Sequence, residues 1–258
     1  MAADNQQGAK ITLHWLDKSR SHRILWLLEE MKLDYELKVY NRTNEKLAPP
    51  ELKGVHPLGK SPVVGVQAAN AEKPIILAES AAITEYLTEY FGKWLVPKRY
   101  EDGEEGKVGA ETEEWLRYRF YMHYAEGSIM PLLVVSLIMH TIKNAPVPFF
   151  IKPITRTIAS KVEESFLAPN FKTHFSFLED QLRSSPNGGD YLCGKDITAA
   201  DILMSFPLEG AELKGVLTKA AYPKTFAYLE RLHQRDAHQR AGQKIKEVTG
   251  KEYDPNIF

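Results

Sequence analysis

The sequence has few cysteines, almost no net charge and no long apolar run, and each shortage excludes a class of protein. Cys193 is the single cysteine among 258 residues, so the chain cannot form an internal disulfide framework, a CxxC redox pair or a cysteine-rich metal site. With 33 Lys and Arg against 34 Asp and Glu, the net charge of −1 offers no field that attracts nucleic acid. We therefore expect no nucleic-acid partner, no metal, and a reducing compartment, the cytoplasm.

Long hydrophobic segments are also missing. The most apolar stretch, Ile129 to Ile142, covers about 14 residues, whereas a membrane-spanning helix needs about 20. Met1 to Lys10 contains no apolar segment, so residues 1–9 are interpreted as a disordered tail and not as a secretory signal. At 43% apolar and 26% charged residues, the composition is typical of a soluble globular protein.

Patterning divides the chain into two domains of different class. Residues 10–97 alternate short β-rich runs with helical periods, whereas residues 109–258 are mostly helical in pattern. Between them, residues 98–108 concentrate glycine and charge without periodicity. This composition indicates a solvated linker, or alternatively an ordered surface loop.

The pattern of the first domain predicts the element order β-α-β, an irregular segment, and then β-β-α. Strands are predicted at Ile11–Trp15, Tyr35–Tyr40, Val63–Val66 and Ile75–Leu77, with helices over Ile24–Met31 and from Ser80 to Tyr90. This order is that of a thioredoxin-like domain, in which helices cover both faces of a four-stranded mixed sheet.

In the second domain, the most specific local pattern is a capping box at Thr198 to Asp201, which predicts the start of a helix. Asp201 stands three residues after Thr198, so its carboxylate can accept from the Thr198 amide in a capping box, and we predict a purely structural role for both. A long helix is expected to begin near Trp115 and to bend at Gly127. The tail from Glu247 to Phe258 lacks a helical period and is expected on the surface.

Four short motifs combine into a specific pattern. They are SRSHR at 19–23, HPLGKSP at 56–62, AESAAITEYL at 78–87 and DITAAD at 196–201. Together they resemble a glutathione transferase from Lys10 to about Val248, most closely the serine-type enzymes, meaning the theta-like group and a fungal and bacterial branch. The resemblance implies the glutathione transferase fold, glutathione as co-substrate and a homodimer.

Glutathione is an extended anionic tripeptide, and the resemblance assigns residues of matching chemistry to it. Lys60 supplies a charge for one carboxylate, and Ser80, at a helix N-terminus, offers its hydroxyl and amides to the other. Glu79 neutralises the amine. Ser61 binds the cysteinyl backbone as an added strand would, which requires Pro62 to be cis. Taken singly, each residue is also an ordinary surface charge, helix cap or turn former.

Ser19 is the candidate catalytic residue. It stands four residues before Arg23, which is the spacing of the catalytic serine and the helix-opening arginine in the serine-type pattern. A hydrogen bond to a charged acceptor contributes about 1.5 to 3 kcal/mol, enough to lower a thiol pKa from about 8.5 toward neutrality. Ser21 is the rival donor, although a helix-capping role suits it better. Arg23 is expected to be structural.

The electrophile pocket is expected in the second domain. Tyr118, Met122 and His123 on the first long helix are candidate lining residues, and packing of the bundle or a dimer interface is the alternative. The apolar segment Ile129 to Ile154 either deepens this pocket or contacts a membrane surface, which would place the protein peripherally on an internal membrane.

The resemblance implies conjugation of glutathione to small hydrophobic electrophiles, with hydroperoxide reduction as a second activity. Two alternatives stay open: a non-catalytic binding or regulatory protein with this fold, and a pathway-specific glutathione-dependent isomerase or ether-cleaving enzyme. Disulfide exchange is disfavoured, because cysteine-type transferases carry cysteine where Ser19 and Ser21 stand.

Overall fold

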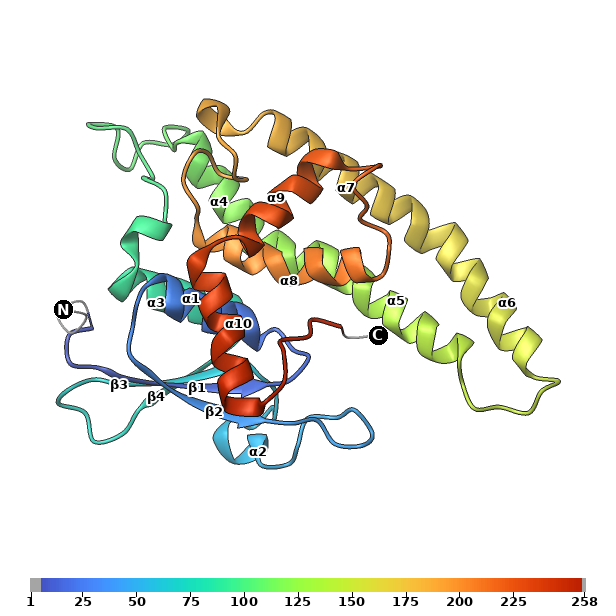
Figure 1. The fold of residues 1–258 in the computed structure, drawn as a ribbon. Helices are drawn as coiled ribbons and strands as arrows, with labels where there is room; N and C mark the ends of the chain where they lie inside the picture. Colours follow the sequence, from blue (N-terminus) through green and yellow to red (C-terminus); the bar gives the residue numbers. More distant parts are fainter. Residues whose placement is uncertain (1–5, 257–258) are drawn as a thin grey trace.

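The computed structural model describes residues 6–256, and a four-stranded sheet forms its N-terminal part (Figure 1). The strands are β1 (Lys10–Leu16), β2 (Tyr35–Tyr40), β3 (Val63–Gln67) and β4 (Ile75–Ala78), in the order β2-β1-β3-β4. β1 and β2 run parallel, whereas β1–β3 and β3–β4 are antiparallel. The predicted mixed sheet of a thioredoxin-like domain is confirmed.

Helices cover both faces of this sheet. α1 (Ser21–Glu30) and α3 (Ser80–Phe91) lie between the sheet and the C-terminal helices, and α2 (Leu52–Val55) lies on the other side (Figure 1). α1 contacts β1 on one side and α8 and α10 on the other, so its residues from Ser21 to Leu28 are all buried. This burial explains why α1 is apolar over most of its circumference.

The rest of the described chain is helical, as predicted. Its helices are α4 (Glu113–Tyr124), η2 (Ala125–Ile129), α5 (Met130–Lys143), α6 (Lys152–Val162), η3 (Glu163–Leu167), α7 (Ala168–Arg183), α8 (Ala199–Leu213), α9 (Pro223–His233) and α10 (Asp236–Thr249), with the short turns η1 (Lys93–Leu95) and η4 (Pro186–Gly188). α8 is buried from Ala199 to Ala211 and forms the centre of this domain.

The predicted capping box begins α8. The Asp201 carboxylate accepts from the Thr198 amide at 2.7 Å. It also accepts from the Leu192 amide at 3.1 Å and from the Tyr228 hydroxyl at 2.7 Å. One buried carboxylate therefore fixes the helix start, the preceding loop and α9 together.

α4, η2 and α5 form one continuous helix of 31 residues, Glu113–Lys143. By length and composition alone this helix could cross a membrane. One third of its most apolar 18-residue window is buried inside the protein, and Tyr121, Met122 and Leu133 are among the buried residues of this helix. The π-turn η2 lies at the bend predicted for Gly127, and beyond it α5 and α6 extend away from the body as a helical hairpin (Figure 1).

Two predictions about the ends of the chain are wrong in part. Residues 1–5 lie outside the described part, but Gln6 is buried, and its side-chain amide exchanges hydrogen bonds with the backbone of Asp34 at 2.8 and 2.9 Å, so residues 6–9 are not a disordered tail. At the other end, α10 continues to Thr249, and Tyr253 then packs face to face on His22 with 3.4 Å between ring centroids. Buried contacts with distant residues hold both segments, and local periodicity does not report such contacts.

The predicted linker is a chain of turns with its ends tied together. Tyr100 and Glu111 form an isolated β-bridge, and the Thr112 hydroxyl donates to the Lys98 carbonyl at 2.6 Å. This is the ordered surface loop that the sequence left open as an alternative.

Candidate functional site

One edge of the sheet gathers most of the predicted site. β1 ends at Leu16, β4 ends at Ala78, and β3, which is antiparallel to both, begins at Val63. The segments that follow or precede these strand ends therefore meet. They carry Ser19 in the β1–α1 loop, Lys60 to Pro62 before β3, and Glu79 and Ser80 at the start of α3.

Three serine hydroxyls form a continuous chain at this edge. Ser19 Oγ donates to the Leu16 carbonyl at 2.8 Å and lies 2.6 Å from Ser21 Oγ. Ser21 Oγ lies 2.5 Å from Ser61 Oγ, which donates to the His14 carbonyl at 2.6 Å. Three hydroxyls have three protons for these four contacts, so one contact has no proton of its own. Rotation of a serine hydroxyl can therefore direct its proton toward an incoming acceptor.

Burial distinguishes the two candidate donors. Ser21 is 0% exposed, and its Oγ also accepts from the Leu16 amide at 3.2 Å. Ser19, at one end of the hydroxyl chain, is 8% exposed, whereas Ser61, at the other end, is half-buried. Ser21 makes no side-chain cap of α1, contrary to the expected capping role; instead its amide donates to Ser19 Oγ at 3.2 Å. Ser21 is therefore enclosed by the protein, whereas Ser19 keeps a small exposed area.

The start of α1 adds positive potential to this edge. The helix begins at Ser21, two residues after Ser19, so its N-terminal amides and dipole favour a negative charge there. A thiolate beside a helix N-terminus is stabilised in the same way. Both the hydroxyl chain and the helix end therefore favour an anion at Ser19.

Arg23 joins the two domains below this edge. It is buried, and it donates to Ser80 Oγ at 2.7 Å, to the Leu203 carbonyl at 2.8 Å and to the Glu126 carboxylate. Arg20 also pairs with Glu126, at 2.9 Å, so its charge is already compensated. Burial opposes ionisation of Glu126, but the two guanidinium groups prevail and hold its pKa below the usual value. Arg23 is structural, as predicted.

The two charged residues assigned to glutathione face solvent. Within residues 6–256, neither the Lys60 ammonium nor the Glu79 carboxylate has a hydrogen bond or ion pair. Glu79 has φ 69° and ψ 116°, a backbone conformation that costs free energy for any residue with a side chain. Pro62 is cis, as predicted.

The predicted electrophile-pocket residues do not share one open lining. Tyr118 is 3% exposed and Met122 is 1% exposed, so both pack the helical bundle, which was the alternative interpretation. Burial raises the pKa of the Tyr118 hydroxyl to about 12. His123 lies on the exposed face of α4.

The structure adds residues that the sequence did not indicate. Glu126, beside the bend predicted at Gly127, pairs with Arg20 in the β1–α1 turn and with Arg23 in α1. The C-terminal tail also reaches this turn, because Asp254 pairs with Lys18 at 3.0 Å. No signal in the sequence points to either contact, since more than a hundred residues separate the partners.

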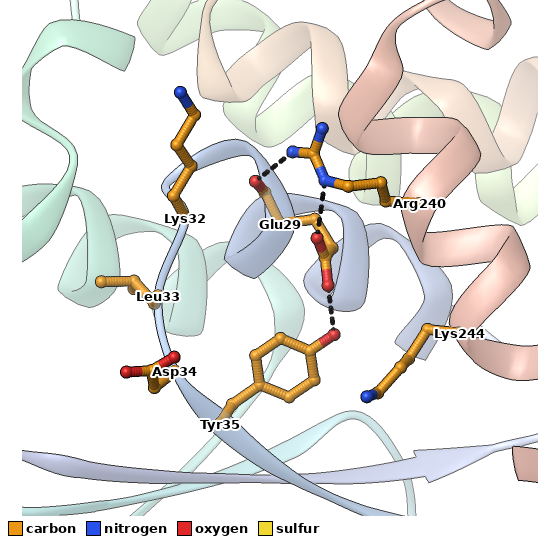
Figure 2. A pocket seen from close by; sticks show the side chains of 7 residues that line it. All are labelled: Glu29, Lys32, Leu33, Asp34, Tyr35, Arg240 and Lys244. Atoms are coloured by element: carbon orange, nitrogen blue, oxygen red, sulfur yellow. Dashed lines mark hydrogen bonds and ion pairs between the residues drawn. The ribbon is translucent and has the colours of Figure 1, made fainter. Parts of the chain in front are cut away.

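A hollow of about 400 Å³ lies at the opposite end of α1, about 15 Å along the helix from Ser19. Figure 2 shows Arg240 of α10 bonded to Glu29, whose carboxylate also accepts from the Tyr35 hydroxyl at 2.5 Å. Burial, with this bond, raises the pKa of Tyr35 above its ordinary value. The residues that line the hollow therefore hold α1 and α10 together. None of them belongs to the hydroxyl chain.

A thioredoxin-like domain followed by an all-helical domain, with a serine and a cis-proline at the sheet edge, defines the class of protein. Residues 10–89 match the glutathione S-transferase N-terminal domain, and residues 146–237 match the glutathione S-transferase C-terminal domain. Glutathione S-transferase 1 of Saccharomyces cerevisiae is 34% identical over 236 residues, which are 92% of this chain and 95% of that protein. The chain belongs to the glutathione S-transferase family.

Solved structures agree with this assignment. A glutathione S-transferase from Actinobacillus pleuropneumoniae is 30% identical, with a TM-score of 0.63 over 96% of both chains. The glutathione transferase URE2P6 from Phanerochaete chrysosporium, solved with oxidized glutathione, shares the fold at 20% identity, with a TM-score of 0.66 over 94% of this chain and 99% of that one.

Proposed function

We propose that the protein is a serine-type glutathione transferase in which Ser19 stabilises the glutathione thiolate. The observation that carries the proposal is the placement of Ser19. It lies near the N-terminus of a helix, and its Oγ ends a hydroxyl chain that runs through Ser21 to Ser61, the residue before the cis-proline Pro62. In this proposal the Ser19 proton turns from the Leu16 carbonyl to the sulfur, which lowers the thiol pKa by about 1 to 2 units.

Glutathione itself would lie along the sheet edge. Its cysteinyl backbone pairs with Ser61, its amine with Glu79, and its carboxylates with Lys60 and the N-terminus of α3 at Ser80. This assignment is supported by the free carboxylate and ammonium at positions 79 and 60. It is also supported by the position of Ser80, whose Oγ accepts a hydrogen bond from the Arg23 guanidinium at 2.7 Å.

The proposed reaction is conjugation to a small hydrophobic electrophile, in a detoxification role. With an aryl halide, the sulfur forms a bond to the ring carbon, the carbon–halogen bond breaks, halide leaves and the thiol proton goes to water. The same thiolate could reduce a hydroperoxide, with a second glutathione completing the disulfide. We assign the electrophile side to the helical domain, where His123, on the exposed face of α4, is the predicted lining residue that remains open to solvent.

Retention on glutathione-agarose, followed by turnover of a generic aryl halide, tests the proposal. Retention with turnover is the expected result. Retention without turnover would favour a non-catalytic binding protein or a specialised glutathione-dependent isomerase or ether-cleaving enzyme. Failure to bind glutathione would overturn the proposal.

We also propose that the protein is a homodimer in the cytoplasm. Apolar side chains on β4, α3, η1 and α4 remain exposed in the single chain, and a second copy would cover them. They are Ile75, Ile76, Tyr90, Trp94, Leu116 and Phe120. Light scattering after size exclusion should give twice the chain mass of 29.3 kDa, and a mass equal to one chain would refute the dimer.

The α5–α6 hairpin supports a proposal of peripheral contact with an internal membrane. Phe149 and Phe150, at its turn, are 83% and 64% exposed. Between Glu126 and Glu163 the chain carries no acidic residue but has four cationic ones, Lys143, Lys152, Arg156 and Lys161. Exposed aromatic rings with surrounding cations suit the interface of an anionic bilayer.

Co-sedimentation with phosphatidylcholine vesicles, with and without phosphatidylserine, tests this contact. Binding should require phosphatidylserine and should fall in the double variant Phe149→Ser, Phe150→Ser. Leu47→Ser, at another exposed apolar position, is the matched control. A protein that stays wholly in the supernatant would exclude membrane contact.

A further inference from the structure

A second cluster of chemistry-bearing side chains lies where the C-terminal helices meet. Glu209 comes from α8, His233 from the last turn of α9, and His238 from the first turns of α10. One possible ligand atom from each residue lies within 4.8 Å of the other two. Glu209 is buried, and neither histidine takes part in the hydroxyl chain.

The spacing of these atoms suits a metal ion. Glu209 Oε1 lies 3.1 Å from His233 Nε2 and 3.4 Å from His238 Nε2. Ligands at about 2.0 to 2.1 Å from a tetrahedral zinc ion are separated from one another by about 3.3 Å. We propose that Glu209, His233 and His238 bind one zinc ion, with water in the fourth position.

The surroundings of the carboxylate orient it for this role. The Tyr253 hydroxyl donates to Glu209 Oε2 at 2.9 Å, which leaves Oε1 facing the two imidazoles. Such an outer hydrogen bond fixes the orientation of a metal-ligating carboxylate. Tyr253 is itself held by stacking on His22 of α1.

One ligand atom lacks any other partner. His238 Nε2 is buried and has no hydrogen bond among residues 6–256, although it lies near Glu209. A buried polar atom without a partner costs about 1 to 3 kcal/mol, and coordination to a cation would remove that cost. The single negative charge of Glu209 and two neutral imidazoles also match the ligand set of known two-histidine, one-glutamate zinc sites.

This inference differs from the expectation of no metal, which followed from the single cysteine. A two-histidine, one-glutamate site needs no cysteine, and its members stand at positions 209, 233 and 238 without a recognisable ligand motif. A bound ion would tie α8, α9 and α10 together. Through Tyr253 it would also hold the C-terminal tail, whose Asp254 pairs with Lys18 beside the Ser19 loop.

Zinc titration of the full-length chain, stripped of metal with a chelator, tests the site by calorimetry and by thermal unfolding. We expect one zinc per chain and a melting temperature that rises with zinc concentration. His233→Gln and His238→Gln should each lower the affinity at least about tenfold and abolish the rise. Tyr253→Phe should weaken binding by a smaller factor, and His140→Gln, on the exposed face of α5, is the matched control.

Cobalt gives an independent spectroscopic readout. Co²⁺ at this site should produce visible d–d absorption bands typical of four- or five-coordinate geometry, and these should disappear in His238→Gln. Retention of that variant on glutathione-agarose shows that it is folded. Absence of stoichiometric binding, or zinc affinity equal in His233→Gln, His238→Gln and His140→Gln, would overturn the proposal and leave the cluster as a hydrogen-bonded Glu209–His233 pair.

Discussion

Ser21 Oγ and Ser61 Oγ lie 2.5 Å apart, although 40 residues separate them in the chain. Ser21 opens α1, and Ser61 precedes β3, so their contact depends on the pairing of β1 with β3, in which His14 faces Val63. The hydroxyl chain therefore exists only when the sheet and α1 are both in place. Changes to Ser19 and Ser21 should have different effects, because Ser21 is fully buried and Ser19 keeps a small exposed area.

Replacing Ser19 with alanine should raise the pKa of bound glutathione by about 1 to 2 units, because the thiolate loses a charge-assisted hydrogen bond. Glutathione affinity should change little, since Lys60, Glu79 and Ser80 remain. The ultraviolet absorbance of the thiolate, titrated against pH in the bound state, measures the shift. Ser165→Ala, at an exposed serine, is the control, and an unchanged pH profile in Ser19→Ala would exclude the catalytic role.

Replacing Ser21 with alanine should mainly affect stability. The change removes the Ser21 hydroxyl that accepts from the Leu16 amide and contacts the Ser61 hydroxyl, and we expect it to cost about 1 to 3 kcal/mol of unfolding free energy. Ser19→Ala removes a more exposed hydroxyl and should cost less. Urea unfolding of both variants tests this order, and equal midpoints would show that burial does not separate the two serines.

Replacing Glu79 with glutamine should raise the glutathione KM about tenfold, because the bound amine loses an ionic partner. The melting temperature should stay unchanged, since the carboxylate has no partner within residues 6–256. Glu72→Gln, in the β3–β4 turn, is the matched control for the change in charge. A lower melting temperature without a change in KM would show instead that Glu79 serves the start of α3.

Local patterns predicted the thioredoxin-like domain well. The alternation at Ile11, Leu13 and Trp15 and the apolar period after Ser21 both report buried positions, and the sequence shows such periodicity directly. The cis state of Pro62 was implied by the family resemblance, whereas the link from Ser19 through Ser21 to Ser61 was not predicted.

Contacts between distant segments could not be predicted in the same way. The buried state of Tyr118 and Met122 depends on how α4 packs against α8, and an aromatic helix face is the same in sequence whether it lines a pocket or a core. Likewise, nothing around Tyr253 indicates that the tail folds back to Glu209. Such contacts depend on tertiary packing of helices whose own pattern fixes only which face is apolar.

The Arg23–Glu126 pair should make the joint between the domains sensitive to acid. Glu126→Gln leaves the buried Arg23 without its anionic partner, so we expect a loss of about 3 kcal/mol of unfolding free energy near neutral pH. Glu113→Gln is the matched control. Glu113, whose side chain is 62% exposed, pairs with Arg117 at 2.8 Å in an i,i+4 pair, which should contribute less than about 1 kcal/mol.

The contribution of Glu126 to the unfolding free energy should decrease as the pH falls. Because the folded state lowers the pKa of Glu126, the unfolded chain binds its proton more readily, and the pair stabilises the fold at every pH above the unfolded value of about 4.3. As the pH falls through the lower folded pKa, that stabilisation is lost, since Glu126 becomes protonated in both states. The unfolding free energies of the wild type and Glu126→Gln should therefore differ most near neutrality and converge below about pH 4. Urea unfolding between about pH 3 and 7 measures the difference, and a gap that stays constant over this range would mean that the charge of Glu126 does not hold the domains together.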